Sequence, residues 1–475
     1  MTAGNRTLLS TLLLIALAAG AVAAAWFGIV KKDEAKDVKK AAEEKLYAFG
    51  PAKVKAITVE AKGETTALAR SGDGWRLESP VPAAAERATV ESIVDKMAEL
   101  RRTSSIAQAP DAAALVRYGL SKPRAKVTLT LEDGKKETLL LGDENAFDGS
   151  AFVQTTGGAV ELVPGDVKWS VERGTFDLRE KRLLPFEDKD LQRVSVVTPR
   201  LSYELVREGD AWRLDAPAKE RADDTTVSRV LGAIRGLRAT AFLRPPQDDR
   251  ALGLDRPRWK VKLVSSGGTR TLVIGGEAGG EASEKAGEKA GERAGGASAP
   301  HGEETGPRPL HAKLEGAAEV AVLAAGSVKD LEQDLFALRD KSVLHFDREK
   351  VAAAKFTVGG SAFEARKDST AGRLAGLLWT LWSLKAKAFV DETGRSLAEH
   401  GLDHPARQVA LLGADGKELD RLYVSADRGG KTFARSASSP RIVEIDGSAL
   451  ESLPKSAQDL SETPEPKPEA KTGRK

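Results

Sequence analysis

The chain has 475 residues, which is enough for about three domains of ordinary size. Its 73 Lys and Arg residues against 70 Asp and Glu residues leave a formal net charge of +3, so there is no basic excess of the kind that binds nucleic acid. Aromatic residues make up only 5%, which leaves few stacking platforms for single strands. The absence of cysteine excludes disulfides, thiolate metal sites and cysteine nucleophiles.

The N-terminal segment is uncharged and mostly apolar from Leu8 to Val30. That length is sufficient to cross the roughly 30 Å hydrocarbon layer of a bilayer. Trp26 and Phe27 lie near one end, where interfacial aromatics are common. A cleaved signal peptide ending near residues 21–23 is the alternative. The apolar run continues past that site, so we expect residues 1–30 to be a retained signal-anchor helix in a bacterial inner membrane.

The flanking charges give two opposing indications of orientation. Only Arg6 precedes the apolar segment, whereas six lysines lie between residues 31 and 45, and this count favours a cytoplasmic body. Long domains, however, translocate largely regardless of flanking charge, and a short N-terminus before an apolar run resembles a signal-anchor. We therefore expect a periplasmic body, with a cytoplasmic body as the alternative. The charged, alanine-rich residues 31–49 are predicted to form a helical stalk.

A Gly-Asp-x-Trp-Arg-Leu block occurs twice, around Trp75 and, 137 residues later, around Trp212. Side chains alternate along a strand, so each Trp should face the same side as the Leu two residues on. Each block is predicted to be the second strand of a hairpin that ends at a proline, Pro80 or Pro217. This alternation favours a core role for both tryptophans over an exposed ligand platform.

A helix is predicted after each block, because apolar residues recur with a spacing of three or four. A third helix is expected at about 374–384. The apolar positions are Val90, Ile93, Val94, Met97 and Leu100 in the first copy; Val227, Val230, Leu231, Ile234 and Leu237 in the second; and Leu377, Leu378, Leu381 and Trp382 in the third.

A Gly-Leu-x-x-Pro signature occurs three times, and an alternating strand, a turn and another strand follow it each time. The signatures run from Gly119 to Pro123, from Gly253 to Pro257 and from Gly401 to Pro405. Their spacings agree with those of the following turn glycines, which indicates internal repetition.

A Leu-Arg-x-Lys signature closes the first two copies at Arg179 and Lys181 and at Arg339 and Lys341. One interpretation is a repeated basic binding stripe. The favoured one is that these cations pair with Glu180, Asp340 and their neighbours where one copy meets the next.

Together these patterns predict an α+β fold of three tandem copies, each made of antiparallel β-hairpins with one main helix. The copies span residues 50–187, 190–347 and 350–460, and the last is divergent. Residues 277–309 form a low-complexity insert in the second copy, and residues 461–475 form a tail rich in Pro, Glu and Lys. Both are expected to be disordered.

No catalytic or cofactor-binding constellation is present in the sequence. His400 and His404 are four apart, but Gly401 and Pro405 argue against the helix that would bring them together at a metal. His345 is expected in an apolar junction, and the acidic residues are scattered. We therefore expect no enzyme activity, no cofactor and no metal site.

The signatures around Trp75, Gly119 and Arg179, behind an N-terminal anchor, resemble the bacterial DUF4340 family, a domain of unknown function. The likeness covers residues 50–347 well and the third copy weakly. Members of that family look like membrane-anchored proteins whose genes often neighbour those of ABC-2-type or gliding-motility-type transporter components. The resemblance implies an accessory role beside a transporter permease or auxiliary subunit.

Two other functions stay open on the sequence alone. A module that binds cell-wall or surface polysaccharide would need exposed aromatic residues on one face. A hydrolase would need two carboxylates held close together with separated pKa values.

Overall fold

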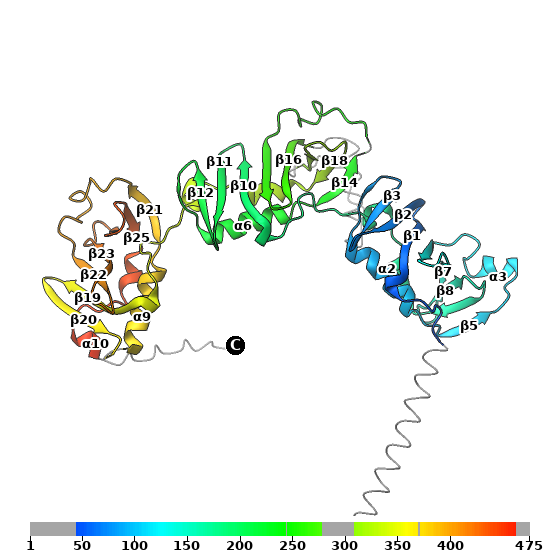
Figure 1. Cartoon of the computed structure of the whole chain (residues 1–475), viewed down its shortest axis with the longest axis horizontal. Helices are drawn as coiled ribbons and strands as arrows, with labels where there is room; N and C mark the ends of the chain where they lie inside the picture. The colour runs from blue at the N-terminus through cyan, green and yellow to red at the C-terminus, as the bar shows by residue number, and fades with distance from the viewer. Residues whose placement is uncertain (1–43, 244, 278–307, 369–370, 462–475) are drawn as a thin grey trace, which may run out of the picture. The chain divides into compact units, whose positions relative to one another are not determined.

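The structure is a computed structural model (Figure 1), and it describes residues 44–243, 245–277, 308–368 and 371–461. The chain divides into two compact units, residues 1–183 and 184–475. Both units consist mainly of antiparallel β-sheet with a few helices, which confirms the α+β prediction.

The first unit contains a nine-stranded sheet in the order β4-β3-β2-β1-β6-β7-β8-β9-β5. Sequence neighbours mostly pair with each other, so the sheet is built from hairpins. Gly72 and Gly134 adopt positive φ in two of the tight turns. The strands are β1 (Val54–Ala61), β2 (Glu64–Ser71), β3 (Gly74–Ser79), β4 (Ala83–Ala84), β5 (Ser104–Ala107), β6 (Ala125–Leu131), β7 (Lys136–Glu144), β8 (Ala151–Thr155) and β9 (Val160–Val163).

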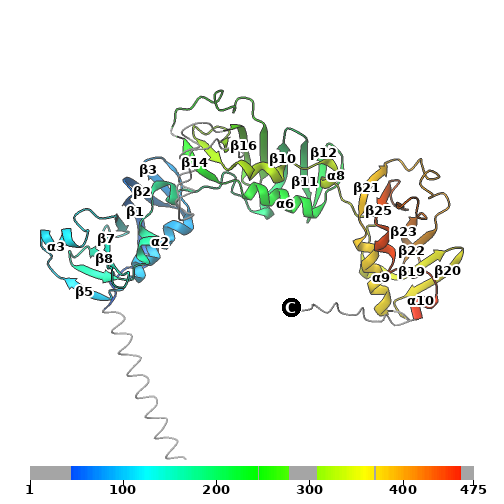
Figure 2. The ribbon, with the colours of Figure 1, turned by 180° about the vertical axis from the view of Figure 1, so that it is seen from behind.

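Helix α2 (Arg87–Glu99) lies against the half of this sheet that contains β1 to β3, as Figures 1 and 2 show. Its residues Val90, Ile93, Val94 and Met97 are buried on one face, as their spacing predicts. Burying each such side chain contributes roughly 1.5–3 kcal/mol. The remaining helical segments are η1 (Pro51–Lys53), α3 (Ala112–Arg117), α4 (Val167–Val171) and α5 (Thr175–Leu178).

The second unit opens with a nine-stranded sheet that repeats the strand order of the first, β13-β12-β11-β10-β15-β16-β17-β18-β14. Its main helix α6 (Asp224–Arg235) begins at Asp223, whose side chain accepts a hydrogen bond from the Thr226 amide. The strands are β10 (Leu191–Val197), β11 (Ser202–Glu208), β12 (Ala211–Ala216), β13 (Glu220–Arg221), β14 (Ala239–Leu243), β15 (Trp259–Ser265), β16 (Gly268–Glu277), β17 (Leu310–Leu314) and β18 (Val320–Leu323); η2 (Asp188–Asp190), η3 (Ala325–Leu331) and α8 (Leu335–Leu338) complete this part.

A seven-stranded sheet follows in the same unit, in the order β20-β19-β22-β23-β24-β25-β21. It has no described counterpart of β3 and β4, so β20 forms an edge and the chain continues from it to helix α9 (Ala371–Ser383). The elements are η4 (Arg348–Lys350), β19 (Val351–Val358), β20 (Ser361–Arg366), β21 (Ala386–Asp391), β22 (Arg407–Gly413), β23 (Glu418–Val424), β24 (Thr432–Ser436), β25 (Ile442–Ile445), η5 (Gly447–Leu450) and α10 (Gln458–Ser461).

The face predicted for the third helix needs one correction. Leu374, Leu378 and Leu381 are buried beneath α9, but Trp382 is 44% exposed and lies beside Trp379, which is 53% exposed. The guanidinium of Arg348 lies 4.9 Å and 5.1 Å from the two ring centroids. The leucines fill the inner face of the helix, and the cation–π contact with Arg348 holds the two rings on the outer face.

The described end of the predicted stalk, residues 44–49, is not helical. Tyr47 is buried in the core of the first unit, and its hydroxyl donates a hydrogen bond of 2.7 Å to the Thr138 carbonyl. Leu46 and Phe49 pack against the same core. Three large apolar side chains in six residues make burial more favourable here than a solvated helix.

The predicted membrane-spanning segment at 8–30 lies outside the described residues, as do most of the insert (278–307) and of the tail (462–475). Within the described ranges, no helix combines the length and the apolar character needed to cross a bilayer.

Candidate functional site

The three Gly-Leu-x-x-Pro signatures form the same cap at the end of a helical turn. Gly119, Gly253 and Gly401 have φ of 70°, 67° and 68°. The following leucine amide then reaches back five residues, as Leu120 does to the Leu115 carbonyl over 2.8 Å. This left-handed glycine with a backward hydrogen bond ends helical turns and favours glycine. Pro123, Pro257 and Pro405 each stand two residues before the next strand and are half-buried.

The caps of the first two copies are hydrogen-bonded to the sheet, and the space at the glycine differs between all three copies. In the second copy, the Gly276 amide donates to the Leu252 carbonyl over 2.9 Å. A Cβ on Gly253 would lie 2.8 Å from the Gly276 nitrogen, which is backbone. A Cβ on Gly119 or Gly401 would instead meet the side chain of Asp143 or Arg428.

We expect Gly253→Ala to lower the free energy of unfolding by about 1–2 kcal/mol, because the left-handed φ and the neighbouring backbone both oppose a methyl group. Gly119→Ala and Gly401→Ala carry the same φ cost, but their neighbours are side chains that can rotate away. Urea denaturation of the three variants checks the order. A Gly253→Ala chain more stable than the other two would contradict it.

The two tryptophans of the repeated block differ in burial. Trp75 is only 5% exposed and lies in the core with Leu77, whereas Trp212 is half-buried. The alternation along the strand therefore places Trp75 in the core as expected, and it overstates the burial of Trp212.

The Leu-Arg-x-Lys signatures each connect to the strand that precedes the main helix. Arg179 forms a β-bridge with Ala85, and Arg339 forms one with Ala222. The Lys341 ammonium donates to the Ala337 and Arg339 carbonyls, and Lys181 makes the corresponding contacts in the first unit. A lysine two residues after the arginine thus satisfies carbonyls that would otherwise lack a partner at the end of a short helix. Burial lowers the pKa of Arg179 to about 10.

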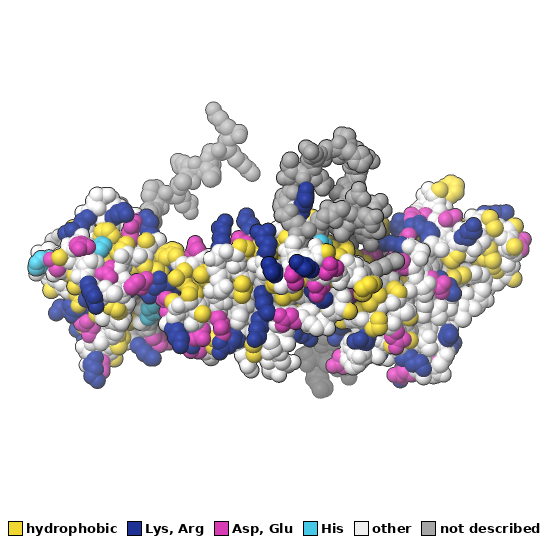
Figure 3. Space-filling model, turned by 90° about the horizontal axis from the view of Figure 1, so that it is seen from above, with side chains coloured by type: hydrophobic (Ala, Val, Ile, Leu, Met, Phe, Trp, Pro, Cys, Tyr) yellow, Lys and Arg dark blue, Asp and Glu magenta, His cyan; other side chains and the backbone are white. Residues whose placement is uncertain are grey.

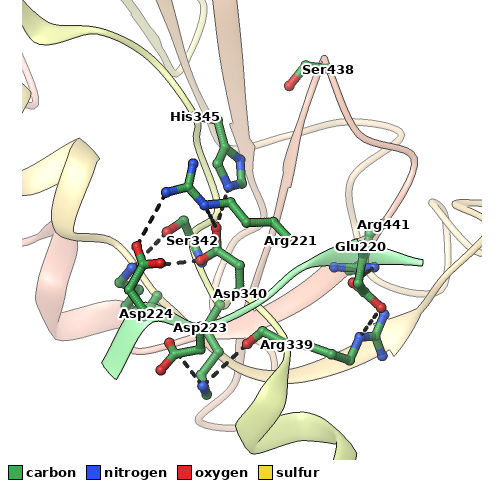
Figure 4. Close-up of polar contacts among 12 residues, drawn as sticks. Glu220, Arg221, Asp223, Asp224, Arg339, Asp340, Ser342, His345, Ser438 and Arg441 are labelled. Carbon is green, nitrogen blue, oxygen red and sulfur yellow. Dashed lines mark hydrogen bonds and ion pairs between the residues drawn. The ribbon is translucent and has the colours of Figure 1, made fainter. Parts of the chain in front are cut away.

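Arg339 occupies the centre of a four-residue ion network in the second unit. Figure 4 shows its contact with Glu220 and the neighbouring Arg441. Its Nε lies 2.6 Å from Glu220, and its two terminal nitrogens reach both carboxylate oxygens of Glu392 at 2.7 Å and 2.9 Å. Arg441 bridges the same two carboxylates at 2.7 Å and 2.8 Å. Both guanidinium groups also lie over the Phe389 ring, 4.2 Å and 4.5 Å from its centroid.

This network corrects the sequence-based prediction of ion partners. The cations do pair with acids, but Arg339 takes Glu220 and Glu392, and Lys341 takes Asp223 at 3.2 Å. Glu220, Glu392 and Arg441 come from segments with no shared motif, so only the folded chain identifies them. We call Glu220, Arg339, Glu392 and Arg441 the junction network.

His345 and Asp340 form a second polar pair beside the junction network. The His345 Nε2 lies 2.7 Å from Asp340 Oδ2, and the Ser342 amide donates to Oδ1 at 2.8 Å. Burial opposes ionisation of this carboxyl, but the hydrogen bonds from His345 and Ser342 hold the pKa of Asp340 well below its usual range. The His345 side chain is 49% exposed, so the expectation of an apolar junction is wrong: a carboxylate close in sequence attracts the ring to a polar position.

A cavity of about 190 Å³ lies between these groups. Its lining includes Glu220, Arg221, Asp340, His345, Phe389, Ser436, Ser439 and Arg441. Both of its carboxylates are engaged by cations, because Arg221 Nε also approaches Asp340 Oδ2 at 3.5 Å. A general acid needs a carboxyl that keeps its proton near neutral pH, and the lowered pKa of Asp340 gives the opposite.

The histidine pair considered for metal binding is not brought together. His400 directs Nδ1 to the Ser396 carbonyl at 2.8 Å and packs edge-on against Phe433, whereas the side chain of His404 is 96% exposed. In the described ranges, no group of three or more His, Asp or Glu side chains is arranged to hold a metal ion.

The charged side chains of the face seen in Figure 3 are mixed in sign. In this view Lys and Arg side chains are interspersed with Asp and Glu side chains. Many charged side chains of the described residues form ion pairs, such as Lys168 with Glu144 at 2.7 Å. Such mixing is typical of a solvated surface rather than of a site that gathers a polyanion.

Comparison with known proteins adds one match. The family described as "Domain of unknown function (DUF4340)" matches residues 75–257 and 370–471, together more than half of the chain. The matched ranges include the third copy, for which the signatures alone indicated a weak likeness, and they leave out residues 258–369. No curated protein and no solved structure matches the chain. The chain belongs to the DUF4340 family, a domain whose function is unknown.

Proposed function

We propose that the protein is a non-enzymatic, membrane-anchored envelope protein that serves as an interaction component of an ABC-type transport system. Its body is a tandem array of three sheet-and-helix copies with one main helix each. The observation that carries the proposal is the pairing in the candidate site: the charges of the junction network neutralise one another within the chain. Such a network joins two sheets and leaves neither Glu220 nor Glu392 poised for acid–base chemistry.

The membrane attachment rests on the apolar run at 8–30, and the periplasmic placement of the body rests on the signal-anchor character of that run. The transporter association rests on the family resemblance alone. An extracytoplasmic array of sheets attached at one end is suited to reach a membrane partner without itself carrying out a reaction.

Membrane attachment can be tested with two charges placed in the apolar run. We expect the full chain to stay with membranes after alkaline carbonate extraction, and the Leu14→Arg, Leu17→Arg double variant to be released. Each arginine at a helix centre costs about 2.5–3.5 kcal/mol of insertion free energy. Leu14→Ile with Leu17→Ile is the matched control and should remain in the membrane. Release of the unaltered chain would contradict the anchor.

The orientation and the partner need a second experiment in intact cells. Trypsin added to spheroplasts should cut the Lys- and Arg-containing segment 278–307 if the body is periplasmic, and protection until lysis would place the body in the cytoplasm.

Cross-linking of the same cells should join the chain to a transporter permease or auxiliary subunit. Cross-links confined to proteins unrelated to transport would contradict the accessory role.

A polysaccharide-binding module is the second candidate, and the exposed Trp379 and Trp382 rings favour it. Neighbouring aromatic rings on one helix face can stack against sugar rings. Co-sedimentation with purified cell-wall polysaccharide tests this function. A Trp379→Ala, Trp382→Ala variant that sediments as well as the unaltered chain would exclude these rings as its site.

A further inference from the structure

Strand β20 presents an unpaired edge, and the hairpin geometry identifies the groups on it. β19 and β20 are joined by Gly359 and Gly360, both with positive φ, and Val358 pairs with Ser361. In a two-residue hairpin the closing pair exchanges both backbone hydrogen bonds, and hydrogen-bonded pairs then alternate along the ladder. Ser361, Phe363 and Ala365 therefore bond to β19, and the amides of Ala362 and Glu364 point away from it.

The other two sheets cover this same edge with a strand of the chain. β3 pairs with β2 and β12 pairs with β11, each supplying the Trp-Arg-Leu block. In the third sheet β20 stands last, and no described strand pairs with its outer side. Ser361 and Ala362 are exposed, so nothing in the described ranges covers that end of the edge.

The third core is nevertheless complete without an added strand. Phe363 is 9% exposed and stacks on Phe356 with ring centroids 5.5 Å apart, and Phe356 is fully buried. Helix α9 packs directly against β20, whereas α2 and α6 contact β3 and β12. The edge is thus a stable, preformed template of unpaired backbone groups rather than a gap in the fold.

We propose that the β20 edge docks one extended segment of a partner protein, which adds to the third sheet as an eighth strand. This deepens the proposed interaction role, because it names the surface through which the partner is held. Backbone hydrogen bonds supply affinity, and alternate side chains supply specificity. The position of β12 on β11 sets the register: Leu205 faces Leu214, and the neighbouring positions face residues 213 and 216.

Charge on the edge specifies the partner further. By this register Ala365 replaces Leu205, and the outward-facing Arg366 and Glu364, which pair with each other at 3.2 Å, replace Val206 and Glu204. The docked strand should therefore carry an apolar residue opposite Ala365, and an acid opposite Arg366 with a base opposite Glu364 would extend this ion pair across the two strands. The chain's own tail fits poorly, because Pro464, Pro466 and Pro468 cannot donate to a ladder.

The test uses the full chain in detergent and a synthetic peptide that copies residues 209–217 with two changes, Arg213→Glu and Ala216→Lys. We expect saturating peptide to slow amide exchange of Ala362 and Glu364 by about tenfold or more. Amides of β11, already paired with β12, should not change. The unaltered peptide places Arg213 opposite Arg366 and should bind more weakly. No protection of β20, or equal protection by a scrambled peptide, would overturn the inference.

An edge variant provides the second measurement. Ala362→Pro removes an outward amide that β19 does not use, so the chain should fold normally and lose the peptide-induced protection, whereas Ala362→Val should keep it.

Because the chain has no cysteine, Glu364→Cys reports self-pairing through a single intermolecular disulfide. A disulfide-linked dimer would identify a second copy of the chain as the occupant of the edge. It would overturn the proposal that a partner protein supplies the added strand. Cross-links to a transporter without protection of β20 by the peptide would overturn docking at the β20 edge alone. The absence of both the cross-links and the protection would overturn the proposed interaction role as well.

Discussion

Replacing Arg339 with methionine should lower the free energy of unfolding of the second unit by about 3 kcal/mol. The side chain is only 11% exposed, and it neutralises Glu220, which is 19% exposed, together with Glu392. Removing one partner of a buried ion pair leaves the other charge uncompensated, which costs about 3–5 kcal/mol. Arg441 still bridges both carboxylates in the variant, so the lower end of that range applies.

Amide exchange at β13 and β21 measures this loss, with β1 of the first unit as an internal reference. The first copy supplies the compensating change, because Ala83 pairs with Leu77 where Glu220 pairs with Leu214. Arg339→Met combined with Glu220→Ala should therefore recover part of the stability. Arg441→Met is the matched control and should cost less, because that side chain is 25% exposed. A loss below about 0.5 kcal/mol for Arg339→Met would mean that the junction network contributes no more to stability than ordinary surface ion pairs do.

The junction network also marks where reasoning from the sequence ends. Alternation at Trp75 and Leu77, and helical spacing at Val90 and Ile93, predict burial because each pattern is local and follows the geometry of one element. Glu392 and Arg441 reach Arg339 only through the pairing of β21 with β25, which no local pattern encodes.

Short elements were missed for a related reason. β5 and β9 have four residues each, too few to show a period, and they pair with each other at the far edge of the sheet from β4. Helix α3 has six residues and is fixed by Asp111, whose side chain accepts a hydrogen bond from the Ala114 amide at 2.7 Å. Its C-terminal cap is the Gly119 signature itself, whose repetition is visible in the sequence but whose place at the end of a helix is not.

His311 differs from the residues at the equivalent position of the other two sheets, as the pairing of their strands shows. It lies on β17 one residue before Ala312, which pairs with Ile274. Phe152 and Phe433 hold the same place before Val153 and Ala434. His311 is 4% exposed, and its Nδ1 has no hydrogen-bond partner among the described residues. A titratable ring therefore occupies a niche that the other copies fill with an aromatic hydrocarbon.

We expect His311→Phe to stabilise the second unit at pH 5 by up to about 2 kcal/mol and to change little at pH 8. Burial lowers the pKa of His311 below 6.5, against a smaller opposing effect of its hydrogen bond with the Gly276 backbone. The unfolded chain therefore takes up a proton first as the pH falls, and stability is lost below about pH 6.5. The limit is about 1.4 kcal/mol for each pH unit below that value.

The pH range in which stability is lost distinguishes the effect of His311 from that of the carboxylates. The pKa of Asp340 and that of Asp391 are both well below the usual range, so their contributions are present above about pH 4 and are lost only in stronger acid. Melting temperatures at pH 5 and pH 8 should differ less in His311→Phe than in the unaltered chain. His404→Gln, at a fully solvated position, should leave that difference unchanged. An equal loss of stability at both pH values would mean instead that the contact between His311 and Gly276 outweighs the cost of burying the ring.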